Sequence, residues 1–470
     1  MALPNTHFGP DHIGSLFDGK KKVFFAGIGG ISMCSLAYIT KRRGHDVSGY
    51  DRTPSKLTRA LEAEGISVFY EASAANVEDA DVLVYTVAIP GDDEQYVRAG
   101  ERGIPRISRA DYLGYLMSGY AKRIGVSGTH GKSTTTSMLD CIFERSGRRP
   151  TVSCGAVMAD AGAAHRVGGE EFFIFEACEY MDSFLDFCPT TAVILNVEMD
   201  HVDYFKSMDQ LTSSFGAFAD RCGEDGVAVV NADDANAMRA LAGCRARRVT
   251  FSRRDGGADY YAKDVRNDHG KRSYTVVCRG EALCELSPSA YGDHVVTDSL
   301  AAFAAAYENG VGADEIAAAL ADFRGVSRRM ENCGKSAAGA DVFSDYAHHP
   351  TEIETTLATA REIASGRVYC AFQPHTYSRT ANFFDDFARV LAESGCEIVL
   401  TEIYSARETT TGGVSSAMLC DRVTALGGEA AYVPALGDLA DYLEAKARKG
   451  DMILLMGAGD IDSAARMLVR

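Results

Sequence analysis

The sequence predicts an α/β protein with parallel, doubly wound sheets in three domains. Short apolar segments alternate with helical segments along most of the chain, a pattern typical of parallel sheets. Two glycine-rich turns each follow an apolar segment and precede a helical one. The length of 470 residues fits about three domains at roughly 150 residues each.

The domain limits follow from where these alternations begin and end. The first unit has predicted strands at 23–26, 46–50, 68–70 and 81–86. A second unit begins near residue 121, and its later strands at 172–175 and 192–196 are almost entirely apolar, as buried parallel strands are. An alanine-rich helix at 300–308 is expected inside this unit, and the third unit has predicted strands at 342–344, 368–372, 397–401 and 452–456. We therefore place the domains at 1–119, 120–325 and 326–470.

The turn after the apolar segment at 124–126 predicts a site for a nucleoside triphosphate. Lys132 and Ser133 follow this turn at the expected start of a helix. Backbone N–H groups there bind phosphates, the lysine reaches the outer phosphates and the hydroxyl binds Mg²⁺. The usual loop has a glycine where Val126 stands, and the alternative is a hydroxyl-rich turn before a surface helix. We favour binding of ATP by Gly128, Thr129, His130, Gly131, Lys132, Ser133 and Thr134.

An earlier glycine turn, at 27–32, predicts a second nucleotide site. It is similar to the dinucleotide-binding loop, with Ser32 at the third glycine position. Asp51 ends the next strand, where such folds bind a ribose hydroxyl. A helix N-terminus binds pyrophosphate whatever base is attached, so this loop leaves both NAD and a UDP-sugar open. The triphosphate loop downstream favours the UDP-sugar.

Acidic residues cluster after two apolar strands that follow the triphosphate loop. Glu176 ends one of these strands, and the other ends at Asn196 and is followed by Glu198, Asp200, His201 and Asp203. Polar residues at the carboxyl ends of parallel strands face the ligand crevice. A single glutamate in such a place is most often a solvated loop residue. The number of acids at both strand ends favours a site for Mg²⁺, which prefers oxygen ligands.

The composition excludes several functional classes. The formal net charge of −17 disfavours general binding to nucleic acid or to an anionic membrane. No apolar run approaches the ~18 residues of a membrane span, and the first residues do not resemble a signal peptide. Thirteen cysteines without a Cys-x-x-Cys pair indicate reduced thiols in a cytoplasmic protein and make a zinc site unexpected.

The chain resembles the Mur ligase family over essentially its whole length. The resemblance rests on both glycine loops, the acidic segments at 176–184 and 196–204, and the motifs at 345–352 and 372–375. It implies a UDP-binding Rossmann-like domain, a central P-loop-type ATPase domain and a C-terminal Rossmann-like domain that closes over the site. The implied reaction joins L-alanine to the lactyl carboxylate of UDP-N-acetylmuramate through an acyl phosphate made from ATP. This is an early cytoplasmic step of peptidoglycan synthesis, and so of cell wall biogenesis, cell shape and cell division.

The resemblance also implies roles for single residues. The residues expected to be catalytic are Lys132, His201, Arg329 and His348. The expected Mg²⁺ ligands are Ser133, Glu176 and His201, and the further ATP contacts are His294, Arg329 and Asp345. The amino acid is expected at His348, His375 and Arg379. The UDP-sugar is expected at Gly27, Gly29, Gly30, Ser32, Asp51, Thr86 and Arg109. Small molecules are the expected partners, with no nucleic acid or membrane, and the protein is expected to be a monomer or a homodimer.

Two departures from the family pattern keep alternatives open. Val295 cannot hydrogen-bond adenine, and Thr376 stands where the family usually has an arginine. A non-catalytic nucleotide-sugar sensor is therefore one rival. A second rival is the recycling ligase that attaches a tripeptide to the same sugar, although the compact segment at 176–189 favours a single amino acid. An NAD oxidoreductase would leave the second half of the chain unexplained.

Overall fold

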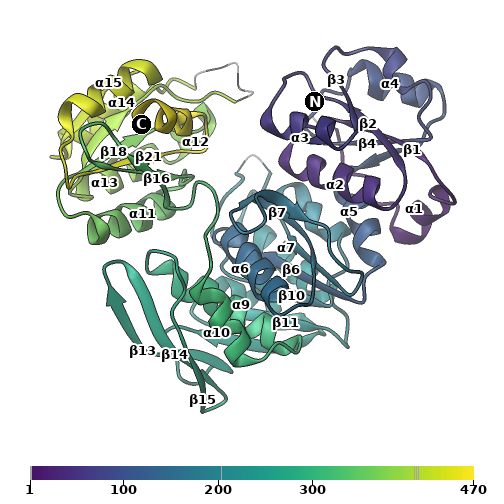
Figure 1. Ribbon diagram of the computed structural model, residues 1–470, viewed down its shortest axis with the longest axis horizontal. Helices are drawn as coiled ribbons and strands as arrows, with labels where there is room; N and C mark the ends of the chain where they lie inside the picture. The colour runs from purple at the N-terminus through teal and green to yellow at the C-terminus, as the bar shows by residue number, and fades with distance from the viewer. Residues whose placement is uncertain (1–2, 203, 407, 409, 411, 470) are drawn as a thin grey trace. The chain divides into compact units, whose positions relative to one another are not determined.

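The structure is a computed structural model that describes residues 3–202, 204–406, 408, 410 and 412–469 (Figure 1). The chain divides into two compact units. The first comprises residues up to 263 together with 275–286 and 297–322. The second comprises 264–274, 287–296 and the chain from 323 onward. The predicted limit between the first and second domains, at 119/120, lies inside the first unit and stays a prediction.

The first sheet lies in the first unit and is entirely parallel, in the order β3-β2-β1-β4-β5. Its strands are β1 Lys22–Ala26, β2 Asp46–Tyr50, β3 Ser67–Phe69, β4 Val82–Tyr85 and β5 Arg106–Ser108. Its helices are α1 Pro10–Leu16, α2 Ile31–Arg42, α3 Lys56–Ala63, α4 Glu94–Glu101 and α5 Arg109–Ser118, with a 3₁₀ turn η1 Ala74–Val77. The central strand β1 is buried at four of its five residues, so the turn that follows it is held firmly.

A ten-stranded sheet follows, in the order β15-β14-β13-β12-β11-β10-β6-β9-β7-β8. Its interior strands are β6 Lys122–Ser127, β9 Phe172–Glu176, β10 Thr191–Ile194, β11 Val227–Asn231 and β12 Arg247–Ser252, which pair in parallel. One edge is the antiparallel pair β7 Thr151–Met158 and β8 Ala163–Arg166. The other edge is formed by β13 Tyr260–Asp268, β14 Lys271–Cys278 and β15 Glu281–Leu286.

Among the described residues, five α-helices and two 3₁₀ turns are associated with this sheet. They are α6 Lys132–Arg145, α7 Met208–Asp220, α8 Ala235–Ala240, α9 His294–Glu308 and α10 Ala313–Ala321, with 3₁₀ turns η2 Tyr180–Asp186 and η3 Leu241–Gly243. Eleven residues of α6 are buried, including the hydroxyl residues at 133–137. Helix α6 is therefore a core element, and the alternative of a surface helix after the triphosphate loop is wrong.

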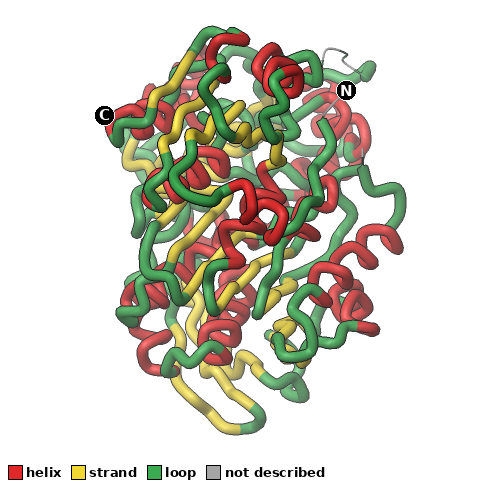
Figure 2. The backbone as a smooth tube through the Cα atoms, turned by 90° about the vertical axis from the view of Figure 1, so that its right-hand side faces the viewer, coloured by secondary structure: helices red, strands yellow, loops and turns green. Residues whose placement is uncertain are grey.

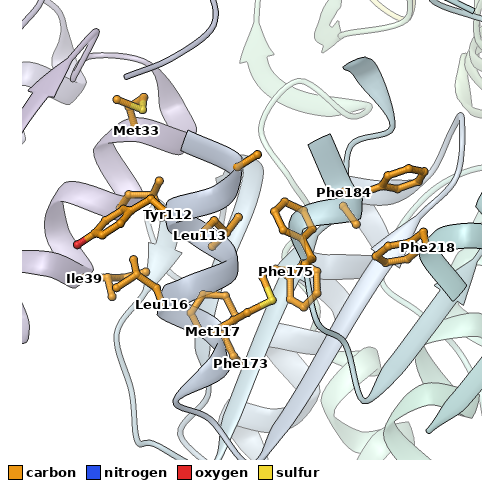
Figure 3. Packing of buried hydrophobic residues seen from close by; sticks show 14 of the residues in the cluster. Met33, Ile39, Tyr112, Leu113, Leu116, Met117, Phe173, Phe175, Phe184 and Phe218 are labelled. Atoms are coloured by element: carbon orange, nitrogen blue, oxygen red, sulfur yellow. The ribbon is translucent and has the colours of Figure 1, made fainter. Parts of the chain in front are cut away.

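Helix α5 joins the core of the first sheet to the core of the second. Its residues Tyr112, Leu113, Leu116 and Met117 are at most 1% exposed and belong to one apolar cluster. Figure 3 shows them between α2 residues on one side and phenylalanines of β9 on the other. The cluster continues to a stacked pair, Phe184 of η2 and Phe218 of α7, with ring centroids 4.8 Å apart. One continuous apolar core therefore supports both sheets of the first unit.

The second unit is built on a six-stranded sheet in the order β16-β17-β21-β18-β19-β20. All pairs are parallel except β16 with β17. The strands are β16 Glu331–Lys335, β17 Asp341–Asp345, β18 Val368–Phe372, β19 Glu397–Leu400, β20 Ala430–Tyr432 and β21 Met452–Met456. The helices are α11 Pro350–Ile363, α12 Tyr377–Asn382, α13 Phe384–Glu393, α14 Ser416–Ala425, α15 Leu436–Lys446 and α16 Ala465–Leu468, with η4 Ile461–Ala464. Two separate apolar clusters contain alternate residues of these strands, as expected for a sheet covered on both faces.

The predicted α/β class and the predicted strands are confirmed, with limits that differ by one or two residues. Helices and strands alternate along most of the backbone, and Figure 2 colours them red and yellow. The alanine-rich helix begins at His294 rather than at 300, because polar residues in its first turn hid the pattern. The strands that were not predicted are β5, β7, β8, β11, β12, β13, β14, β15, β16 and β20. In β13, charged residues at exposed positions interrupt the apolar signal.

Candidate active site

The triphosphate loop connects the buried strand β6 to helix α6. Gly131 caps the helix with φ 84°, a left-handed conformation that favours glycine. A Cβ atom at this position would lie 2.5 Å from Oδ1 of Asp298 and 3.1 Å from Cδ1 of Leu195. Gly128 is equally confined, since its Cβ would lie 2.9 Å from that of Leu195. Because a Cβ atom would clash at either position, glycine is needed for this loop conformation. The conformation keeps the backbone N–H groups at the start of the helix, where an anion binds.

The loop that follows β10 fixes the shape of the triphosphate loop. The Asn196 side chain accepts a hydrogen bond from the His130 N–H at 2.8 Å and donates to the His130 carbonyl at 3.1 Å. The Thr129 hydroxyl donates to the Glu198 carbonyl at 3.0 Å and accepts from the Glu198 N–H at 2.9 Å. The predicted ATP residues are thus held by the strand end that the sequence marked as acidic.

Lys132 is surrounded by acceptors. Its Nζ donates to the carbonyl oxygens of Gly128 at 2.5 Å and Thr129 at 3.1 Å, and to Oε2 of Glu179 at 3.1 Å. Burial opposes the charge of Lys132, but the hydrogen bond and charge of Glu179, together with nearby groups that include Glu176, outweigh burial and raise the pKa of the lysine. Glu179, whose side chain is 2% exposed, was missed as a site residue. Its only sequence signal is its position three residues after Glu176.

Ser133 and Glu176 form a pair suited to a hard divalent cation. The Ser133 hydroxyl donates to Oε2 of Glu176 at 2.7 Å, and the same oxygen accepts from the Gly155 N–H at 2.8 Å. A hydroxyl and a carboxylate beside a triphosphate loop are oxygen ligands of the kind that Mg²⁺ takes. These residues therefore fit the predicted metal.

His201 lies on the other side of Glu179. Its Nε2 is 3.7 Å from Oε1 of Glu179 and 4.0 Å from Oδ2 of Asp200, and its ring packs on Tyr180 with centroids 4.7 Å apart. The backbone of His201 has φ 50°, which is uncommon for a residue with a Cβ atom and is typical of functional loops. The structure thus brings Lys132, Glu179 and His201 together, whereas Asp203 lies outside the described residues.

The first glycine loop brings its predicted residues together as well. Gly27 has φ 85°, and a Cβ atom there would lie 2.7 Å from Cγ2 of Thr86. The Gly29 N–H donates to Oδ2 of Asp51 at 3.0 Å, and Gly30 caps helix α2. Asp51 therefore contacts the loop itself, as the spacing of glycine loop and strand end predicts.

Arg109 supplies a cation to this loop from a distant part of the chain. It is the first residue of α5, and its Nη1 donates to Oγ of Ser32 at 3.1 Å. Burial lowers the pKa of Arg109, and the charges of nearby acidic groups, which include Asp186 and Glu176, oppose that effect. Arg109 thus interacts electrostatically with the acidic segment behind the triphosphate loop.

In the second unit, Asp345 and Arg329 lie near one another. The Asp345 carboxylate accepts from the N–H groups of Met330 at 2.7 Å and Ala347 at 2.8 Å. Burial raises the pKa of Asp345, while the Arg329 charge opposes the rise. Arg329 pairs with Glu352 at 3.6 Å and lies over the ring of Tyr346 at 5.5 Å.

The predicted amino-acid residues form a cluster in the same unit. His348 and His375 have ring centroids 6.1 Å apart, and Nη1 of Arg379 is 3.3 Å from Nδ1 of His375. Burial and the nearby charges of His348 and Arg379 lower the pKa of His375 to about 4. His375 is therefore neutral at pH 7, in surroundings that favour a carboxylate.

The predicted ATP contact His294 also groups with the second unit. It follows the turn at Gly292, where φ is 101° and a Cβ atom would lie 2.7 Å from Cε1 of His294. Val295, beside it, is 1% exposed and belongs to the apolar interior. Packing in the apolar interior explains why an apolar side chain stands at position 295.

Three family models cover the chain. Residues 22–121 match the Mur ligase family catalytic domain, 126–306 the Mur ligase middle domain, and 328–459 the Mur ligase glutamate ligase domain. The UDP-N-acetylmuramate–L-alanine ligase of Lachnospira eligens is 40% identical over 456 residues, which are 97% of this chain and 99% of that relative. This chain belongs to the Mur ligase family.

Solved Mur ligase structures agree with this assignment. The UDP-N-acetylmuramate-alanine ligase of Thermotoga maritima superposes with a TM-score of 0.82 at 28% identity, over 95% of this chain and 98% of that one. A murein peptide ligase of Psychrobacter arcticus superposes with a TM-score of 0.72 at 24% identity, over 95% and 98%. The second likeness concerns the fold alone. Within the described part of the chain, no helix is long and apolar enough to cross a membrane.

Proposed function

We propose that this protein is an ATP-dependent ligase that joins L-alanine to the lactyl carboxylate of UDP-N-acetylmuramate and releases ADP and phosphate. The observation that carries the proposal is the near-complete alignment with a relative of that name at 40% identity. The lysine and acidic residues around the triphosphate loop supply matching chemistry. The protein would act in the cytoplasm on small molecules, as a monomer or a homodimer.

The first chemical step makes an acyl phosphate. An oxygen of the lactyl carboxylate bonds to the γ-phosphorus of ATP, the bond to the β–γ bridging oxygen breaks, and ADP leaves. Lys132 stays cationic in its acidic surroundings, so it is suited to stabilise the charge on the transferring phosphoryl group. We assign Arg329 the same task and assign Asp345 and His294 to ATP binding.

Ser133, Glu176 and His201 are the residues that would hold Mg²⁺. When bound, the metal neutralises charge on the phosphate oxygens. The hydrogen bond between Ser133 and Glu176 keeps the hydroxyl and the carboxylate side by side. Glu179 adds a buried carboxylate between Lys132 and His201.

The second step makes the amide bond. The alanine nitrogen bonds to the acyl carbon, phosphate leaves with the bridging oxygen, and the nitrogen loses a proton. We assign Arg379 to the alanine carboxylate, with His348 and His375 beside it. A neutral His375 can accept a hydrogen bond from the amine, because its pKa of about 4 keeps it unprotonated at pH 7.

The test is phosphate release in a coupled assay with UDP-N-acetylmuramate, ATP and Mg²⁺. L-alanine, glycine, L-serine and the murein tripeptide are supplied one at a time. The proposal expects turnover that depends on L-alanine. Preference for the tripeptide would assign the recycling reaction instead, and binding of both nucleotides without phosphate release would assign a sensor.

A further inference from the structure

Residues 3–9, called here the N-terminal strap, are fastened to the first sheet and its last helix. Leu3 is 8% exposed in an apolar cluster with β1 and β4, and the Tyr85 hydroxyl donates to the Pro4 carbonyl at 2.7 Å. The Thr6 hydroxyl accepts from the Ser108 N–H at 2.9 Å. The N–H groups of Phe8 and Gly9 donate to the two oxygens of Asp111 at 2.8 and 3.2 Å. Ser108 and Asp111 flank Arg109, so the strap holds the start of α5 on both sides of that arginine.

The same strap is fastened to η2, the segment that follows Glu179. The Asn5 side chain donates to the Met181 carbonyl at 3.1 Å and to the Ser183 hydroxyl at 3.4 Å. His7 Nδ1 lies 2.6 Å from Oδ1 of Asp186 in a hydrogen-bonded pair. The Asp186 side chain is 5% exposed, whereas the His7 side chain is 64% exposed. A surface residue thus holds a buried carboxylate at the end of η2.

The segment η2 has a strained backbone and is linked by hydrogen bonds to the loop that carries His201. Met181 and Asp182 both have φ 54°, a strained conformation that its surroundings must hold. Asp182 accepts hydrogen bonds from the hydroxyls of Ser214 and of Tyr204, the latter at 2.6 Å. The Tyr204 N–H donates to the His201 carbonyl at 2.8 Å, so η2 is tied to the loop that carries His201.

We propose that Asn5 and His7 are positioning residues for the ligase reaction, because the strap fixes the segment that carries Glu179, the partner of Lys132, relative to Arg109. This inference rests on the proposed function. Arg109 would hold the UDP-sugar and Lys132 the ATP, and the two reacting atoms must meet at about 3 Å. A misplacement of about 1 Å costs roughly 10²-fold in rate, even when neither substrate is bound more weakly. The hydrogen bonds of the strap described above go to Tyr85, to the start of α5 and to η2, so we expect its effect to be on geometry.

The experiment measures L-alanine-dependent phosphate release by the full-length protein carrying Asn5→Ala, His7→Ala or both. We expect kcat to fall about 10-fold for each single change and further for the pair, with KM for ATP and for UDP-N-acetylmuramate within about 2-fold of the parent. His7→Asn retains a donor at the place of Nδ1 and should restore most of the rate. His12→Ala is the matched control, since His12 lies in α1 on the same terminal segment and its ring packs beside Phe8, with centroids 5.0 Å apart.

The outcomes are distinguishable from one another. An unchanged kcat in the double variant, a rise in either KM without a fall in kcat, or an equal loss in His12→Ala would each overturn the inference. Urea unfolding of His7→Ala separates folding from positioning, because truncating an exposed side chain leaves no cavity. A urea midpoint low enough to explain the lost rate would also overturn it. Failure of the proposed function would be seen earlier, as absence of L-alanine-dependent turnover in the parent protein.

Discussion

The two glycine loops of the first unit use the same backbone geometry but obtain their positive charge differently. Gly27 and Gly131 have almost the same φ, 85° and 84°, and each follows a parallel strand and precedes a helix. The triphosphate loop carries its own cation, Lys132, inside the motif. The first loop receives Arg109, which bonds to a residue 77 positions away along the chain. Loop geometry is therefore encoded locally in both, whereas the charge of the first loop depends on the fold.

Removing the local cation gives the largest expected effect. Lys132→Ala should lower phosphate release by about 10³-fold, because no other group on the loop carries its charge. Binding of UDP-N-acetylmuramate, measured by calorimetry, should stay within about 2-fold. Lys263→Ala, at an exposed position of β13, is the control. Near-normal turnover of the Lys132 variant would contradict both the proposed function and the role of Lys132 as the cation of the triphosphate loop.

Removing the distant cation should affect the other nucleotide. Arg109→Ala should weaken UDP-N-acetylmuramate binding by roughly 10- to 100-fold, as expected for the loss of a charge-assisted hydrogen bond worth about 1.5–3 kcal/mol. ATP affinity should change by less than about 2-fold, and Arg109→Lys should recover part of the sugar binding. An equal loss of ATP affinity, read from the same titrations, would mean that the two loops share this arginine.

Adding a methyl group tests whether the loops are equally confined. Gly131→Ala and Gly27→Ala combine left-handed strain with contacts of 2.5 Å to Asp298 and 2.7 Å to Thr86, so each should cost about 2–4 kcal/mol of unfolding free energy. Gly44→Ala is the matched control, since φ is 92° there and no atom lies within 4 Å of the new methyl group. Strain alone should cost it about 1–2 kcal/mol in urea unfolding. Equal losses at all three positions would show that close packing contributes nothing.

The smallest expected effect is on the pH dependence of stability and comes from Asp186, a carboxylate whose charge acts on Arg109. Burial and the Asp111 charge raise the pKa of Asp186 to about 6, while His7 and Arg221 oppose the rise. Between about pH 4 and about pH 6, the Asp186 carboxyl therefore keeps its proton in the folded protein and loses it in the unfolded chain. The free energy of unfolding should then fall as the pH increases through this range. Asp186→Asn should flatten that slope in urea unfolding at several pH values. The control is Asp209→Asn, at a residue whose side chain is 85% exposed, and a slope that persists unchanged in Asp186→Asn would contradict the assignment.

The sequence predicts these sites only as far as the chemistry is local. The pairing of Ser133 with Glu176 follows from a glycine loop and a strand end, and the contact of Gly29 with Asp51 follows in the same way. Glu179 carries no motif of its own, because its importance comes from a backbone turn that places it against Lys132. The N-terminal strap also lacks a sequence motif, since the hydrogen bonds that fasten it reach residues 81 or more positions away. The roles of the individual site residues stay predictions that the experiments above address.

The buried helix α5 sets a limit on modular engineering. An exchange of the first nucleotide-binding region between related ligases, cut near residue 119, would place a foreign α5 against Phe173 and Phe175 of the host. Chimaeras of that kind would inherit mismatched apolar surfaces on both sides of one helix. A crossover near residue 322 leaves that helix with its original neighbours, but it separates residues 264–274 and 287–296 from the rest of the second unit.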